Sequence, residues 1–260
     1  VYGPGTLITT NKTAGFSVDL DGNFYHQSGT IIISGAINSS VDLQGDVGGA
    51  NTYNVIIDNS TNSVEWAKDT IIENDLTLIS GTFQSYGGGV GAKDIIVSGN
   101  VDIGSAGGTT TLGRNDGWGG TPAEVAVEFG SLTIGANGTY YATSGTTTLN
   151  DALGRTQAEL GSYIYDNGGS FVHNSGTLAV DSLTAGALII RPAVGNGNLY
   201  NLSSSRSTGQ VLYWATPGMI IENDLSISQT TMYPGGVSYD MTVSGTVTLV
   251  EGAAPYDAQM

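Results

Sequence analysis

The chain has two histidines, His26 and His173, and they are the first residues to consider for acid–base or metal chemistry. Each begins the same kind of segment, HQSGT at 26–30 and HNSGT at 173–177, and the two histidines lie 147 positions apart. A catalytic triad needs a histidine next to an activated serine, and the chain has no Gly-X-Ser-X-Gly elbow. We therefore predict that each imidazole is packed or hydrogen-bonded at a recurring corner.

Two polar turns have residues that could bind calcium. Asp19, Asp21 and Asn23 place oxygen ligands at alternate positions around a glycine, as in half of a calcium loop. An EF-hand loop has a bidentate acid six residues beyond that glycine, where this chain has Ser28. Residues 115–117 (NDG) are a second candidate. Ordinary polar turns explain both segments, so we predict no metal and no cofactor.

The most regular acidic motif is END, at 73–75 and again at 222–224, and turns that precede strands explain both copies. Trp66 and Trp214 occupy equivalent places in the two copies, which favours packing over ligand binding. Trp118, within NDGWGG at 115–120, has no counterpart. It is therefore the better candidate for stacking on a sugar ring.

Composition limits the class of protein. The 260 residues include 40 glycines, only 12% are charged, and the mean hydropathy is +0.02, which favours a folded chain with many turns. A net charge of −16 repels phosphate backbones, so we exclude nucleic acid as a partner. No stretch approaches the roughly 18 apolar residues of a membrane-spanning helix. There is no cysteine, so disulfides and thiolate sites are excluded, and we expect the acidic side chains to point outward.

The chain contains a long internal duplication, found by comparing it with itself. NFYHQSGTIII at 23–33 matches SFVHNSGTLAV at 170–180, TIIENDLTLI at 70–79 matches MIIENDLSIS at 219–228, and IIVSGNVDI at 95–103 matches MTVSGTVTL at 241–249. We therefore divide the chain into an N-terminal edge segment (1–22), a first copy (23–104), intervening coils with a short helix proposed at 151–161 (105–169), a second copy (170–250) and a tail (251–260). GTYYATSGTTTL at 138–149 is a partial echo of the same unit.

Apolar residues within each copy alternate with Ser, Thr, Asp or Gly, which is typical of short, half-buried strands. Gly and Asn turns follow at intervals of about 6 to 12 residues. Paired β-sandwiches and a parallel β-solenoid could both satisfy this pattern. Five Phe and three Trp are few for sandwich cores, so we predict an all-β parallel β-solenoid with a thin aliphatic core.

Three segments of the first copy resemble known repeats: FYHQSGT at 24–30, YNVIIDNS at 53–60 and DLTLISGTF at 75–83. They resemble the repeats of parallel β-helix surface proteins, such as bacterial adhesins, secreted filament proteins and phage fibre or decoration proteins. The resemblance implies a β-helix and a structural or attachment role outside the cell, on a virion or a microbial surface.

Parallel β-helices also include polysaccharide lyases and glycoside hydrolases, which set two or three carboxylates on neighbouring coils. This chain has only seven Lys and Arg, and no local cluster joins them to carboxylates. We therefore predict a non-enzymatic protein with no catalytic residue. A carbohydrate-active enzyme and a carbohydrate-binding module, with glycan contact, are the alternatives.

The termini suggest how the chain meets a partner. It begins VYGPG, without an initiator Met, so we expect a processed product or a fragment. End coils of a solenoid expose unpaired backbone groups, and neither end resembles a cap. We predict homo-oligomerisation or anchoring to a larger assembly through a terminus. Residues 1–10 (VYGPGTLITT) are favoured over the C-terminal end, because Leu7–Thr10 can add a strand to a neighbour.

Overall fold

The computed structural model describes residues 5–10, 16–19, 26–34, 41–44, 51–66, 69–85, 93–114, 125–151, 153, 163–181, 187–193, 197–235 and 239–250. Every regular element among these residues is a strand, so the predicted all-β class is confirmed. The proposed helix at 151–161 lies almost entirely outside the described residues.

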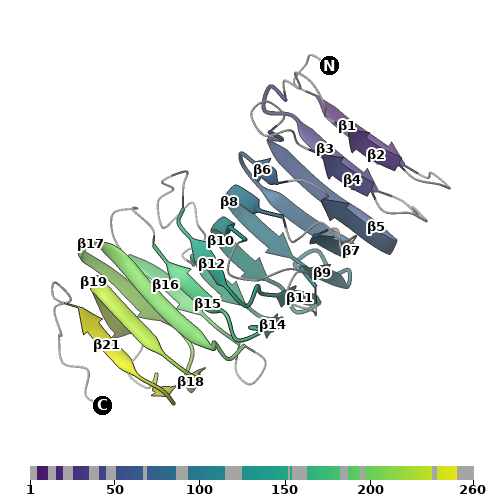
Figure 1. Ribbon diagram of the computed structural model, residues 1–260. Coiled ribbons are helices and arrows are strands. Elements are labelled where there is room, and N and C mark those ends of the chain that lie inside the picture. Colours follow the sequence, from purple (N-terminus) through teal and green to yellow (C-terminus); the bar gives the residue numbers. More distant parts are fainter. Residues whose placement is uncertain are drawn as a thin grey trace.

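The strands of the first part of the chain are β1 (Thr6–Thr10), β2 (Phe16–Asp19), β3 (Thr30–Ser34), β4 (Val41–Gln44), β5 (Asn54–Trp66), β6 (Thr70–Ile72), β7 (Leu76–Ser85), β8 (Ile95–Ile103) and β9 (Thr110–Leu112). Those of the remainder are β10 (Val127–Ile134), β11 (Gly138–Tyr141), β12 (Thr146–Leu149), β13 (Tyr165–Asn167), β14 (Ser170–Val172), β15 (Thr177–Val180), β16 (Ala187–Arg191), β17 (Asn201–Trp214), β18 (Met219–Ile221), β19 (Leu225–Pro234), β20 (Met241–Val243) and β21 (Val247–Val250). Figure 1 shows them stacked side by side between the two ends of the chain.

The described strands pair in parallel, and all except β18 and β20, which form a sheet of their own, belong to three ladders. Ladder 1 holds β1, β3, β13, β16, the first halves of β5 and β7, and the second halves of β8, β10, β17 and β19. Ladder 2 holds β2, β4, β9, β11, β14 and the second halves of β5 and β7. Ladder 3 holds β6, β12, β15, β21 and the first halves of β8, β10, β17 and β19.

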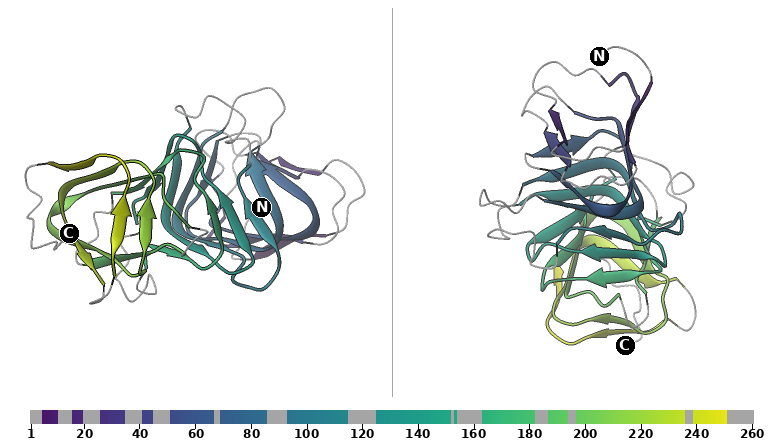
Figure 2. Two further views of the ribbon diagram at one scale, coloured as in Figure 1. Left: turned by 90° about the horizontal axis from the view of Figure 1, so that it is seen from below. Right: turned by 90° about the vertical axis from the view of Figure 1, so that its right-hand side faces the viewer.

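From β3 onward the chain visits the three ladders in one cyclic order, 1, 2, 3, with the two-stranded sheet β18–β20 in the place of ladder 2 near the end. Successive partners in ladder 3 lie 20 to 32 residues apart, as at Val127–Thr147 and Ile95–Val127. Most circuits, which we call coils, therefore add one strand to each ladder; two of them add only a single bridge at one side, Thr52–Ile72 and Leu199–Ile221. The two views of Figure 2 show the chain winding around a common interior.

The core lies between the ladders, because alternate side chains of each strand point inward. β8 shows the alternation over its whole length, with Ile95, Val97, Val101 and Ile103 buried. One continuous apolar cluster runs from Ile31 to Ile227. Trp66 and Trp214 both belong to it, as the equivalence of their positions predicted.

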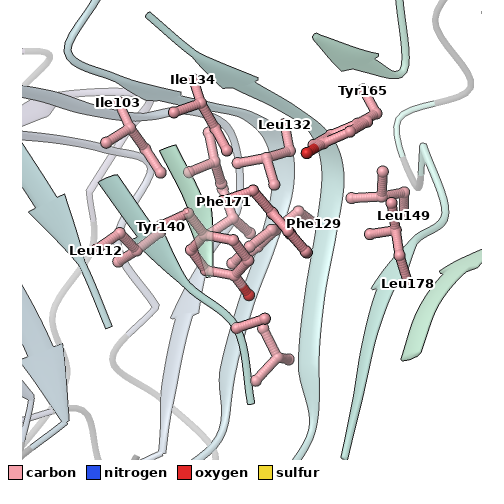
Figure 3. Close-up of a cluster of buried hydrophobic side chains, with 14 of the residues drawn as sticks. Ile103, Leu112, Phe129, Leu132, Ile134, Tyr140, Leu149, Tyr165, Phe171 and Leu178 are labelled. Carbon is pink, nitrogen blue, oxygen red and sulfur yellow. The ribbon is translucent and has the colours of Figure 1, made fainter. Parts of the chain in front are cut away.

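The middle of this core is aromatic, which differs from the aliphatic column expected from composition. Phe129, Tyr140, Tyr165 and Phe171 meet there, with ring centroids 5.7 to 5.9 Å apart (Figure 3). The Tyr140 hydroxyl lies 2.8 Å from the Thr147 hydroxyl, which gives it a hydrogen-bond partner inside the core. Aromatic side chains also lie elsewhere in the core, as where Trp66 packs on Phe83 with ring centroids 4.6 Å apart.

The two sequence copies occupy different ladders. The segment after His26 forms β3 in ladder 1, whereas the equivalent segment after His173 forms β15 in ladder 3. The echo strand β12 pairs directly with β15. The second copy is therefore displaced by one ladder relative to the first, which places its corners on another side of the stack.

Candidate functional site

The most elaborate side-chain arrangement in the described chain is the corner at His26, which we call the first His corner. Its turn is type I′, because Gln27 and Ser28 have φ of 45° and 59° and the Gly29 N–H donates to the His26 carbonyl at 2.7 Å. The Ser28 N–H also donates to His26 Nδ1, at 3.0 Å. A neutral imidazole that accepts at Nδ1 carries its proton on Nε2.

His26 Nε2 points at a carboxylate on a later coil. It lies 2.9 Å from Glu73 Oε2, and Asn51 donates to the other Glu73 oxygen at 3.0 Å. The imidazole stacks on Tyr53, with ring centroids 5.4 Å apart and planes 20° apart. Both ring nitrogens and one ring face are thus engaged within the protein, so the imidazole is arranged as a fastener between coils.

The second His corner repeats these contacts around His173. Asn174 and Ser175 have φ of 46° and 61°, and the Ser175 N–H donates to His173 Nδ1 at 2.9 Å. The partners of the imidazole are equivalent as well: Glu222 at 3.2 Å, held by Asn198 at 3.0 Å, and Tyr200, stacked at 5.4 Å. The sequence prediction of a hydrogen-bonded histidine at a recurring corner is confirmed for both copies.

A polar column runs beside each corner, where the strands begin. In the first copy Asn54 donates to the Thr30 hydroxyl, Asn74 donates to Asn54 Oδ1 at 2.8 Å, and Asp75 Oδ1 accepts from the Asn100 N–H at 2.7 Å. The second column repeats these bonds with Thr177, Asn201, Asn223, Asp224 and Thr246. The END motifs therefore form turns before strands, as the sequence predicted, and also tie successive coils together.

The echo segment shows what the corner loses without histidine. The register of β12 and β15 places Ala142 at the position that corresponds to His173 on the next coil. The Ala142 N–H donates to the Val172 carbonyl. Thr143 and Ser144 do not adopt the left-handed φ of the His corners. Instead the Thr143 hydroxyl accepts the Gly145 N–H at 3.1 Å. The imidazole acceptor and the type I′ turn thus occur together.

This geometry gives a test of the corner. We expect His173→Ala to lower the free energy of unfolding by about 1–2 kcal/mol, because the Ser175 N–H and Glu222 each lose a partner. His173→Asn is the matched variant, since an asparagine oxygen can still accept the N–H two residues on but is too short to reach Glu222. It should therefore cost less than alanine in urea unfolding. Equal losses for the two variants would contradict the assigned role of Nδ1.

Most other sequence candidates fall outside the described residues. Trp118 and the segments 115–117 and 20–23 lie there, and Asp19 is described only as the last residue of β2. Among the residues that the structure describes, no three His, Asp or Glu side chains are grouped closely enough to hold a metal ion. Of the basic residues, Arg191 pairs with Asp166 at 2.6 Å and stacks over Tyr163, and the hydrogen bond to Asp166 raises the pKa of the guanidinium.

Sequence reasoning missed the two tyrosines and the two asparagines that complete the His corners. Tyr53 and Tyr200, like Asn51 and Asn198, share the 147-residue offset of the histidines, which was the available signal.

Within the described residues no helix is long and apolar enough to cross a membrane. The chain matches no protein-family model, no curated protein and no solved structure at a significant level.

Proposed function

We propose that the chain is a parallel β-solenoid that serves as a non-enzymatic structural or attachment element outside the cell, on a virion or a microbial surface. One observation carries the proposal: the strands enter three parallel ladders in a fixed cyclic order around one core. Such a winding makes each coil a platform for the next, and its length grows with the number of coils.

The polar residues support a mechanical role. Both nitrogens of each histidine are used in internal hydrogen bonds, and the END motifs bond to neighbouring coils. These groups are the ones that acid–base catalysis would otherwise need. The same contacts recur in both copies, on different ladders, as is expected of a repeated structural unit.

Localisation and activity test this proposal separately from the fold. Gold-labelled antibodies against the chain, applied to intact particles or cells of its source, are expected to label the outer surface. Incubation with acidic and neutral polysaccharides is expected to release no reducing ends and no unsaturated uronates. Labelling confined to the cell interior would overturn the structural role outside the cell, and chain cleavage would favour the alternative, a carbohydrate-active enzyme.

A further inference from the structure

The last described strand, β21, presents exposed apolar side chains. Val247, Leu249 and Val250 of β21 are 46%, 60% and 47% exposed. Their equivalents in the first copy behave differently, since Val101 and Ile103 of β8 are fully buried. The reason is the next coil, where Leu132 and Ile134 of β10 lie in register against Val101 and Ile103.

The backbone edge of β21 has no second partner strand among the described residues either. Among the described strands, β21 pairs with β19 alone and β20 with β18 alone. An unpaired strand edge is a template for another strand. The end therefore offers both an apolar surface and a row of backbone donors and acceptors.

The other end of the same chain has a strand edge of its own, on β1, that is unpaired among the described strands. β1 pairs with β3 alone among the described strands and lies at the opposite end of the molecule from β21 (Figure 1). Its first residues, Thr6-Leu7, repeat the hydroxyl–leucine order of Ser131-Leu132, the residues that follow Asn100-Val101 in ladder 1. β1 thus matches the first two residues of the strand that covers this coil in the first copy, and Thr9 stands at the place of Ile134.

The polar columns fix the register. Thr6 lies in register with Thr30, where the first column begins before it continues through Asn54 and Asp75. The second column runs through Thr177, Asn201 and Asp224 and ends at Thr246. Placing Thr6 after Thr246 sets Leu7 opposite Val247 and Ile8 opposite Thr248. It also displaces the added copy by one ladder, as the second half of the chain is already displaced from the first.

We propose that β21 binds β1 of a second copy of this chain, in parallel and in that register, so that copies stack head to tail. The contact is heterologous and repeats at each new end, which produces rows rather than closed dimers. This inference rests on the proposed function, because it requires that the chain be a stack of coils.

Light scattering of wild type and two variants tests the surface. We expect concentration-dependent association at physiological or higher salt, where repulsion between acidic chains is screened. Leu249→Asp should weaken association at least about tenfold, because a charge replaces a leucine that the proposed contact would bury. Ile71→Asp is the matched control, since Ile71 is also exposed, at 40%, but lies on β6, away from the end. Equal effects of the two variants would overturn the proposal.

Disulfide cross-linking tests the register. The chain has no native cysteine, so no competing disulfide can form. A Thr248→Cys chain mixed with an Ile8→Cys chain should form a disulfide-linked pair, because partners about 4.8 Å apart suit a disulfide. Thr248→Cys mixed with Thr10→Cys, two residues out of register, should cross-link much less. A monomeric wild type that still scatters X-rays as a rod would overturn the stacking but leave the proposed function intact; a compact, non-rod particle would overturn both.

Discussion

Replacing Phe129 with alanine is expected to lower the free energy of unfolding by about 3–5 kcal/mol, the usual cost of removing a buried phenylalanine. Phe129 is fully buried on β10, between Val97 and Leu149 in ladder 3, and its ring meets Tyr140. The hydrogen-bonded ladders hold the neighbouring coils in place, so we expect the cavity to collapse only partly.

Guanidinium unfolding followed by circular dichroism measures this loss. Ile71→Ala is the control, because it removes an apolar side chain that is already 40% exposed, and we expect it to cost about 1 kcal/mol or less. A Phe129→Ala protein as stable as this control would show that the aromatic centre of the core does not hold the coils together.

The second large effect concerns Gly176, in the second His corner. A Cβ added there would lie 2.1 Å from the Thr143 carbonyl oxygen and 2.8 Å from that of Gly145, on the coil beneath. Both obstacles are backbone atoms, so the coils would have to separate. We expect Gly176→Ala to cost about 1–3 kcal/mol or more, as overpacking does.

Gly168 provides the matched substitution. A Cβ there meets no atom closer than 3.6 Å, which is ordinary contact, so Gly168→Ala should change stability by no more than about 1 kcal/mol, and in the stabilising direction if at all. Thermal unfolding of the two variants side by side makes the comparison. Similar melting temperatures would contradict the close stacking of the coils at the corner.

Period-two patterns and the duplication were sufficient to predict the all-β class, the buried Trp66 and Trp214 and the bonded histidines. They were not sufficient to predict which residues contact each imidazole. Tyr53, for example, stacks on His26 from the next coil, and no local sequence pattern indicates a contact between coils. The displacement of the second copy was also out of reach. A 147-residue offset fixes how much chain separates the copies, but not how many changes of ladder occur within it.

The acidic residues show a similar limit. We expected them to point outward, but Glu65 and Asp151 are buried among the described residues. Glu65 accepts a hydrogen bond from Gln84 at 2.8 Å, from the neighbouring strand of ladder 2. A buried carboxylate requires such a partner, and its partner lies 19 residues away in the sequence.

The stacking of coils along one axis is tested most directly by distances between pairs of spin labels. Ile71 and Thr248 both lie in ladder 3, seven pairings apart, and Ile71 and Ser203 lie five pairings apart in the same ladder. At about 4.8 Å for each pairing, the account predicts separations of about 34 Å and about 24 Å. Electron–electron resonance that gives the longer distance for Thr248, by about 10 Å, would confirm the stack; equal distances, as in a closed ring of strands, would contradict it.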